Sequence, residues 1–412
     1  MNSALAALRS GDWLTIERMK RWAPVFALVS ILLLALDFWT HTRFGVVDGK
    51  GEQIGRDFVN YWAAARLALE GRTDLAYHVD KFVSYERSLT AANAEIKWEG
   101  YPPVGMLLAA PFGALPFLPA FAAWTLAGWA VLTRMLAPRM GLFLAACALM
   151  AAPAFYIDAM SGQNGAFSAA LLAGGIMLLD RRPLLAGMLF GLLCYKPHLG
   201  VLIPLALAAS GRWRVAVAAG VTVALVLGAS VLEVGWRTWA DFLAIDPPIH
   251  RRLLETGVGI WSRIPSVFIA GRLLGAPIVW AYALQGLSAV LAATGLVLVW
   301  RGPTSTLFKG AALMIATFLA TPYAWDYDMV ILVFAAVWYW GEAEAKGWRP
   351  WEKTALAALI VSPWVLPTFS RYAHLQLGPA ILWFMFALLV TRARALGVAA
   401  DLPVSGSLAG VV

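Results

Sequence analysis

Long apolar runs alternate with short polar segments along almost the whole chain. Roughly 20 apolar helical residues are needed to cross the hydrocarbon core of a bilayer, which is about 30 Å thick. The pattern therefore predicts an all-α polytopic membrane protein with about twelve transmembrane helices in a single integral domain over 1–412. The full spans are expected at about 22–40, 116–136, 141–157, 166–180, 214–232, 277–300, 305–321, 328–341, 353–366 and 376–391.

The polar segment 41–100 is the longest interruption and is expected to be the first outer loop. Two stretches in it, about 58–70 and 79–96, have the mixed polarity of helices that lie along a membrane surface. A second outer loop is expected at 233–263. Between 102 and 137 we expect one short surface or re-entrant piece and then one span, because two spans would place the basic end of that segment outside.

The stretch 184–210 begins and ends at basic segments and is interrupted by Tyr195-Lys196-Pro197-His198. Each arm has only about 12 residues, too few to cross the hydrocarbon core as an upright helix. Broken helices at membrane depth occur where they line protein or a water-filled cavity. Lys196 and His198 are therefore expected within the membrane thickness, at the floor of an outward-facing cavity.

Composition supports a membrane protein and argues against a nucleic-acid-binding protein. The residues are 61% hydrophobic and 14% charged, and the mean hydropathy is +0.71. The net charge of +8 comes from basic residues that stand singly or in pairs beside apolar runs, as the positive-inside rule places them, so we expect no nucleic-acid partner. With these residues inside, both termini are predicted to be cytoplasmic. All five histidines then fall on the outer side or at the broken helix.

Asp57 is the candidate for chemistry in the first outer loop. A carboxylate at the mouth of a membrane cavity can act as a general base on an acceptor hydroxyl. The alternative is a helix cap, because Asp is favoured just before a helix such as 58–70. Its neighbours Asn60, Tyr61 and Trp62 have the polar edges and rings that bind a sugar, and they favour the catalytic interpretation.

Basic residues supply candidates for binding a phosphate. Ionisable groups within a membrane usually have a function, so Lys196 and His198 are expected to neutralise a phosphate at the bilayer surface. The alternative for Lys196 is a lysine that extends to the interface beside a helix break. Arg251, after Asp246-Pro247-Pro248, is expected to contact phosphate or lipid headgroups, unless it belongs to a solvated loop.

Several other polar residues are expected at the outer ends of spans. Gln163 and Asn164, between two glycines, suit either hydrogen bonding to a sugar or a plain turn. Asp326-x-Asp328 is compatible with a divalent metal beside a diphosphate, or with a helix start. Because three residues match such a pattern by chance, no metal or other cofactor is assigned and metal dependence stays open. Tyr101, Tyr323 and Asp328 are added to the expected sugar and acceptor site.

Five motifs in this order carry a resemblance to a known family. They are Asp57-Phe58-x-x-Tyr61-Trp62, Tyr101-Pro102-Pro103, Gly162-Gln163-Asn164, Tyr195-Lys196-Pro197-His198, and Thr321-Pro322-Tyr323 with Tyr327-Asp328. Together they resemble glycosyltransferase family 87, which contains polyprenyl-phosphate-mannose-dependent mannosyltransferases of the GT-C type. The resemblance implies a GT-C bundle with a helical first periplasmic loop, a bacterial inner membrane, and Asp57 as the catalytic base on the periplasmic side.

The expected activity follows from this resemblance. It is an inverting transfer of a sugar, most simply mannose, from a polyprenyl-phosphate donor to a lipid or glycan acceptor, with membrane lipids as further partners. The alternatives are a polytopic secondary transporter, or a flippase or ligase of a polyprenyl pathway. A transporter commonly shows internal repeats and its site near the midplane. This chain shows no repeat between its halves and has a long first outer loop, which favours the transferase.

Overall fold

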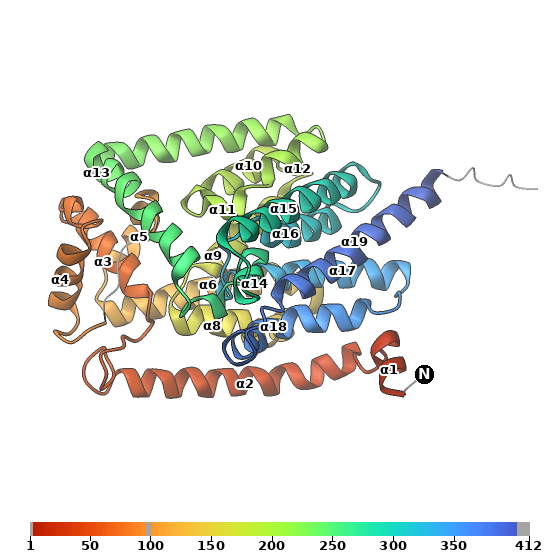
Figure 1. The fold of residues 1–412 in the computed structure, drawn as a ribbon, viewed down its shortest axis with the longest axis horizontal. Coiled ribbons are helices and arrows are strands. Elements are labelled where there is room, and N and C mark those ends of the chain that lie inside the picture. The colour runs from red at the N-terminus through yellow and green to blue at the C-terminus, as the bar shows by residue number, and fades with distance from the viewer. Residues whose placement is uncertain (1–2, 96–99, 402–412) are drawn as a thin grey trace, which may run out of the picture.

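In the computed structural model of this chain, residues 3–95 and 100–401 are described, and they form helices joined by short turns. No strand occurs among them, apart from an isolated bridge between Val47 and Gln53. Helix α2 (Ile16–His41) runs along one edge of the molecule and the first part of α13 (Trp213–Thr256) along the opposite edge (Figure 1). The remaining helices lie between these two. Because the described residues form helices and no strand, the predicted all-α class is confirmed.

Among the described residues, five helices are long and apolar enough to cross a membrane. They are α2, α6 (Phe117–Met140), α13, α15 (Ile278–Arg301) and α19 (Gly378–Asp401), of which Gly378–Leu396 meets that test. Counting the bent pair α7 (Leu142–Ala151) and α8 (Pro153–Ser161) as one more brings the number to six. The predicted number of about twelve is therefore not confirmed, although a span in the first forty residues and one after Pro116 are found as expected.

Shorter helices fill the interior of the bundle. They include α5 (Val104–Gly113), α9 (Gly165–Leu178), α10 (Pro183–Leu192), α11 (Pro197–Gly200), α12 (Ile203–Ala209), α16 (Thr306–Ala320) and α17 (Ile331–Lys346). The longer helix α18 (Glu352–Ala373) packs against α19 and α8. Helix α16 is buried on all sides from Gly310 to Leu319. A helix that is apolar all round belongs in the centre of a large protein or in a membrane, and here α9, α11, α15, α17 and α19 pack against it.

The span expected at 141–157 is instead two helices, α7 and α8, that meet at an angle of 72°. The break lies at Ala152, which has extended backbone angles (φ −72°, ψ 121°). Pro153 explains it, because a proline disfavours helical geometry in the residue before it and is well placed at the first position of a new helix. The second helix thereby turns toward the interior, where its end meets the first outer loop.

The first outer loop is helical, as predicted. Helix α3 (Phe58–Leu69) packs against α5, and α4 (Val79–Leu89) follows a short 3-10 turn. Helix α4 is shorter than the expected 79–96; it ends before Thr90, and the expected end at 96 lies outside the described residues. Phe58 is completely buried among the rings of Phe117, Phe121 and Trp124. This aromatic cluster anchors the start of α3 to α6.

The expected second outer loop, 233–263, is largely helical. Helix α13 runs to Thr256 and is broken only at Gly235, whose φ of 82° lies in the region that favours glycine. After this kink the second arm of α13 turns back over the interior (Figure 1). Thr238 and Thr73 hydrogen-bond at 3.0 Å, which joins this arm to the first outer loop. The prediction missed the helix because Pro247 and Pro248 suggest a loop, yet both are tolerated inside it.

Candidate functional site

A cavity of about 480 Å³ lies where the first outer loop, the broken helix and the second arm of α13 meet. Five parts of the sequence therefore form one space, namely 57–102, 163, 195–198, 242–263 and 323–327. Eight of the residues that the sequence singles out line it, namely Asp57, Asn60, Tyr61, Tyr101, Gln163, Lys196, His198 and Tyr323. The spacing along the chain could not show that these residues converge, but the topological argument that they share one face predicted it.

Asp57 accepts a hydrogen bond from the amide nitrogen of Gln163 at 2.8 Å. It stands directly before α3, yet its side chain makes no capping bond there and its own backbone is already helical (φ −84°, ψ −9°). The cap proposed as an alternative is therefore not formed. Instead the carboxylate belongs to the cavity, and its orientation is determined by a residue from another part of the chain.

Gln163 connects Asp57 to the aromatic wall. Its side-chain oxygen accepts hydrogen bonds from the hydroxyls of Tyr61 and Tyr101, the latter at 3.3 Å. The ring of Tyr61 stacks on Trp124 with an interplanar angle of 15°. Because the amide oxygen accepts from the two hydroxyls, the amide nitrogen is the group that points toward Asp57. Of the two alternatives expected for Gln163, a sugar-binding side chain or a plain turn, the plain turn does not describe a side chain that lines the cavity.

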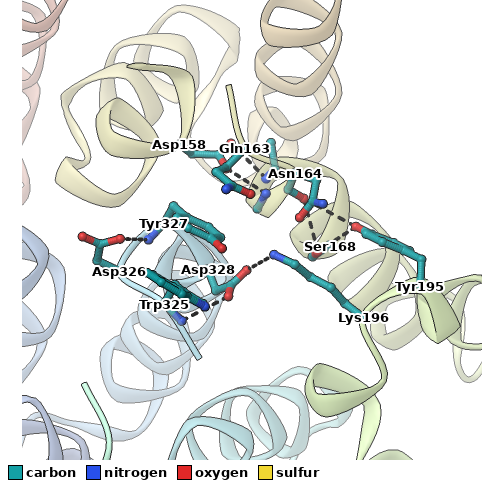
Figure 2. Close-up of polar contacts among 12 residues, drawn as sticks. Asp158, Gln163, Asn164, Ser168, Tyr195, Lys196, Trp325, Asp326, Tyr327 and Asp328 are labelled. Atoms are coloured by element: carbon teal, nitrogen blue, oxygen red, sulfur yellow. Dashed lines mark hydrogen bonds and ion pairs between the residues drawn. The ribbon is translucent and has the colours of Figure 1, made fainter. Parts of the chain in front are cut away.

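The turn that carries Gln163 is built by a carboxylate that sequence reasoning did not single out. Asp158, which is buried, accepts the backbone N–H groups of Gly165 at 2.7 Å and Ala166 at 3.1 Å (Figure 2). It thereby satisfies unpaired donors at the start of α9. Gly162, directly before Gln163, has a φ of 59°. A Cβ added at Gly162 would lie 2.4 Å from the Cβ of Phe58. Packing and charge together determine the shape of this turn.

Lys196 forms a buried ion pair at the cavity wall. Its Nζ lies 2.6 Å from Oδ1 of Asp328, and the two side chains are only 1% and 0% exposed. Figure 2 shows the ammonium group pointing from the broken helix toward Asp328. It also lies over the rings of Tyr327 and Tyr101, 4.7 and 5.6 Å from their centroids. The alternative of a lysine that extends to the interface does not describe this arrangement.

Asp328 lies behind Lys196 and does not line the cavity. Its second carboxylate oxygen accepts the backbone N–H of Trp325 at 3.1 Å. Both oxygens are therefore used within the protein, which corrects the expectation that Asp328 contacts a sugar directly. Its role in the structure is to neutralise Lys196 and to close the turn that begins at Trp325.

Arg263 is the cation that sequence reasoning did not select. It lines the cavity and forms a two-pronged contact with Asp326, with Nε at 3.0 Å and Nη2 at 3.1 Å from its oxygens. Burial lowers the pKa of Arg263, but the Asp326 carboxylate outweighs that effect and holds this pKa above its ordinary value. The guanidinium is therefore always charged. The sequence contained one sign of this contact. Trp325 and Tyr327 flank Asp326, and guanidinium groups such as that of Arg263 stack on aromatic faces.

Besides Asp328, three further predicted site residues lie outside the cavity lining. The side chain of Arg251 is 75% exposed and faces Glu255 at 3.5 Å, so it is a surface residue of α13. Trp62 is buried, and its indole N–H donates to the carbonyl of Leu115 at 2.9 Å. Asn164 is buried within the turn. Helical phase explains all three, since neighbours of a cavity residue along a helix or turn point elsewhere.

The residues near Asp326 and Asp328 do not form a free carboxylate pair, because each acid is paired with a cation. Among the described residues, His41, Asp48 and Glu52 form one group whose ligand atoms lie within 4.8 Å of one another. Both ring nitrogens of His41 already have partners there, the carbonyl of Asp37 at 2.8 Å and Glu52 at 3.1 Å. We therefore assign no metal to either group.

Comparison with known proteins gives one match. The sequence model of glycosyltransferase family 87 matches residues 100–322, which is more than half of the 412-residue chain. The matched segment includes Tyr101, Gln163, Lys196 and His198, and it begins after Asp57. No curated protein and no solved structure matches the chain.

Proposed function

This chain belongs to glycosyltransferase family 87, and from that premise we propose that it transfers a sugar from a polyprenyl-phosphate donor to a lipid or glycan acceptor, with Asp57 as the general base. Glycosyl transfer needs a group that takes the proton of the acceptor hydroxyl. Asp57 lines the cavity and is oriented by Gln163. The single observation that carries the proposal is that the Asp57 carboxylate and the cationic side chains of Lys196 and Arg263 line the same space.

Transfer in this proposal is a direct displacement. The acceptor oxygen attacks the anomeric carbon, its proton passes to Asp57, and the bond from that carbon to the phosphate oxygen breaks. One displacement inverts the anomeric centre, so a β-linked mannosyl phosphate would give an α-mannoside. A base within hydrogen-bond reach of the hydroxyl and a separate site for the leaving group are the two requirements.

The sugar would lie against the aromatic and amide wall. Tyr61, Tyr101 and Tyr323 line the cavity with Asn60, whose side-chain oxygen is buried with no hydrogen-bond partner among the described residues. A buried polar atom without a partner is costly and is expected to gain one when a ligand binds. A sugar hydroxyl supplies that partner, and the tyrosine rings supply an apolar surface with polar edges.

The phosphate would lie against the opposite wall, near Lys196 and His198. Arg263 takes the place of Arg251 in this proposal, because it lines the cavity and Arg251 does not. Cations aimed at a departing phosphate stabilise the charge that develops on it. The prenyl chain would remain in the bilayer, which the exposed apolar surface of helices such as α2 contacts: only 11% of the most apolar window of that helix is buried.

For location we propose a bacterial inner membrane with both termini cytoplasmic and the cavity on the periplasmic side. Basic residues support it, since Arg18, Lys20 and Arg21 precede the apolar part of α2, and Arg301 ends α15. The positive-inside rule places such ends in the cytoplasm. The first outer loop then lies on the other side with Asp57. Family membership leaves no support for the alternative of a secondary transporter.

The direct test incubates membranes that contain this protein with radiolabelled polyprenyl phosphate mannose. The expected result is a new labelled glycolipid or glycan that membranes without the protein do not form. A nucleotide-linked mannose should give no product when the synthesis of the lipid-linked donor is blocked. Label that stays in the donor, or transfer directly from the nucleotide sugar, would contradict the proposed donor.

A further inference from the structure

The second arm of α13 carries two ionisable residues that the transfer described above does not use. Asp246 and His250 lie one helical turn apart and both line the cavity. The kink at Gly235 brings this arm over the interior, and Thr238 fastens it to Thr73 of the first outer loop. Their position on one helix face is therefore part of the architecture of the site.

The two side chains form a close pair. Nδ1 of His250 lies 2.8 Å from Oδ2 of Asp246, and the exposed fractions of the two side chains are 24% and 7%. The other oxygen of Asp246 is buried and has no hydrogen-bond partner within the described residues. A carboxylate that bonds one nitrogen of an imidazole determines which nitrogen remains available, and here that is Nε2.

The environment of His250 places it beside the phosphate wall. Its ring contacts the ring of Tyr323 edge-to-face, with centroids 5.1 Å apart. His198 contacts the same tyrosine, with centroids 6.1 Å apart. Two imidazoles from different helices thus flank one aromatic ring. Nε2 of His198 is also buried without a partner in the part of the chain that the structure describes, so both rings offer a nitrogen to a ligand.

The charges around the cavity show why a histidine is needed there. Lys196 and Arg263 line it, but each is already paired with an acid, Asp328 or Asp326. The other lining carboxylates are Asp57 and Asp246. The lining side chains therefore offer no excess positive charge unless histidines are protonated. A phosphate that enters this cavity needs such a charge, because bringing an anion close to the carboxylates of Asp57 and Asp246 is unfavourable.

We propose that His250, as an imidazolium held by Asp246, hydrogen-bonds the donor phosphate and balances the charge it gains on leaving. The inference rests on the proposed function. As the acceptor oxygen bonds to the anomeric carbon, the electron pair of the broken carbon–oxygen bond stays on the phosphate, which becomes a dianion. Asp57 holds the acceptor proton, and Nε2–H of His250 donates to a phosphate oxygen. Asp246 is a positioning residue.

The test uses the purified full-length protein in lipid nanodiscs and measures binding of farnesyl phosphate, with farnesol as the uncharged comparison. In H250Q the side chain can still hydrogen-bond but cannot carry charge. We expect farnesyl phosphate to bind at least about tenfold more weakly, as for loss of a charge-assisted hydrogen bond, with farnesol binding unchanged. D246N should weaken phosphate binding in the same direction and less.

The matched control is H78Q. His78 also faces an acid of the second arm, Asp241, at 3.7 Å, but neither residue lines the cavity. This variant should bind farnesyl phosphate as the wild type does. Equal binding by wild type and H250Q would overturn the role of His250 and leave the transferase proposal intact. A wild-type protein that binds farnesyl phosphate no better than farnesol would overturn both the prenyl-phosphate donor and this contact.

Discussion

Two ion pairs within the described part of the chain are almost fully buried, and their surroundings differ. Lys196 and Asp328 are 1% and 0% exposed, and Arg392 and Glu352 are 1% each. Nε and Nη2 of Arg392 bond the two oxygens of Glu352 at 2.8 and 2.7 Å. Glu352 also accepts from the hydroxyl of Tyr339 at 2.6 Å and the N–H of Arg349 at 2.9 Å. Every strong acceptor position of that acid is occupied.

Lys196 is different because its pair is incomplete. Its Nζ has one bonded acceptor, Asp328, and two aromatic faces, although an ammonium group has three donors. It lines the cavity, whereas neither Arg392 nor Glu352 does. Burial alone therefore does not mark a functional charge. Lys196 differs from Arg392 because its ammonium group keeps a further N–H donor beside the cavity. Substitutions at the two residues can test this difference.

The largest effect is expected for K196A compared with R392A. Each leaves a buried acid without its partner, which should lower the free energy of unfolding by about 3–5 kcal/mol. Only K196A should also reduce sugar transfer per folded molecule, by about a hundredfold or more, since a group that stabilises the leaving phosphate is lost. Thermal unfolding and transfer assays on the same preparations check this. Equal loss of transfer in the two variants would remove the distinction between the pairs.

A double substitution separates charge at the cavity from stability. In K196M/D328N both charges are removed, and the asparagine can still accept the N–H of Trp325. Replacing a buried pair by neutral groups is often close to neutral for stability, so unfolding should be near that of the wild type. Transfer should remain as low as in K196A. Recovery of transfer together with stability would show that Lys196 acts only through folding.

Gln163 provides a smaller effect on the opposite wall. In Q163L, Asp57 loses a hydrogen bond worth about 1.5–3 kcal/mol for a charged group, so transfer should fall about tenfold to a hundredfold. The matched control is Q285L, because Gln285 is similarly buried and bonds Phe268 and Leu319, and none of these three residues lines the cavity. Q285L should lower stability and leave transfer per folded molecule unchanged. Similar transfer in both variants would contradict the role of Gln163.

The smallest effect is expected for W62F. The indole bond to the carbonyl of Leu115 is lost, which should reduce the free energy of unfolding by about 1 kcal/mol. Transfer should not change, because Trp62 packs between α3 and the end of α5 and does not line the cavity. Chemical denaturation and the transfer assay check the two parts. A large loss of transfer would return Trp62 to the sugar site.

How far sequence reasoning reached can be seen at the breaks in the helices. The polar interruption at Lys196 was predicted, because two short apolar arms between basic ends leave no other path. The first helix of the first outer loop was predicted at about 58–70, and α3 spans Phe58–Leu69. Both depend on local composition and length, which a single sequence contains. The number of full spans cannot be predicted from local composition and length, because short buried helices and true spans have similar apolar runs.

The residues that were misplaced depend on direction and on distant partners. Arg251 and Arg263 stand in the same predicted loop, and only the kink at Gly235 and the continuation of α13 decide which one faces the cavity. Trp62 is adjacent to a cavity residue but points to α5. Asp158 had no local motif at all, because its partners are backbone groups on the far side of a turn.

The central claim is that Asp57 takes the acceptor proton. It is tested most directly by comparing D57N with D80N, a change at an exposed carboxylate of the same loop, in transfer from radiolabelled polyprenyl phosphate mannose. We expect D57N to lower transfer by about 10²–10⁴-fold while farnesyl phosphate binding and thermal unfolding stay at wild-type values, and we expect D80N to transfer normally. Transfer by D57N at the wild-type rate would contradict the central claim.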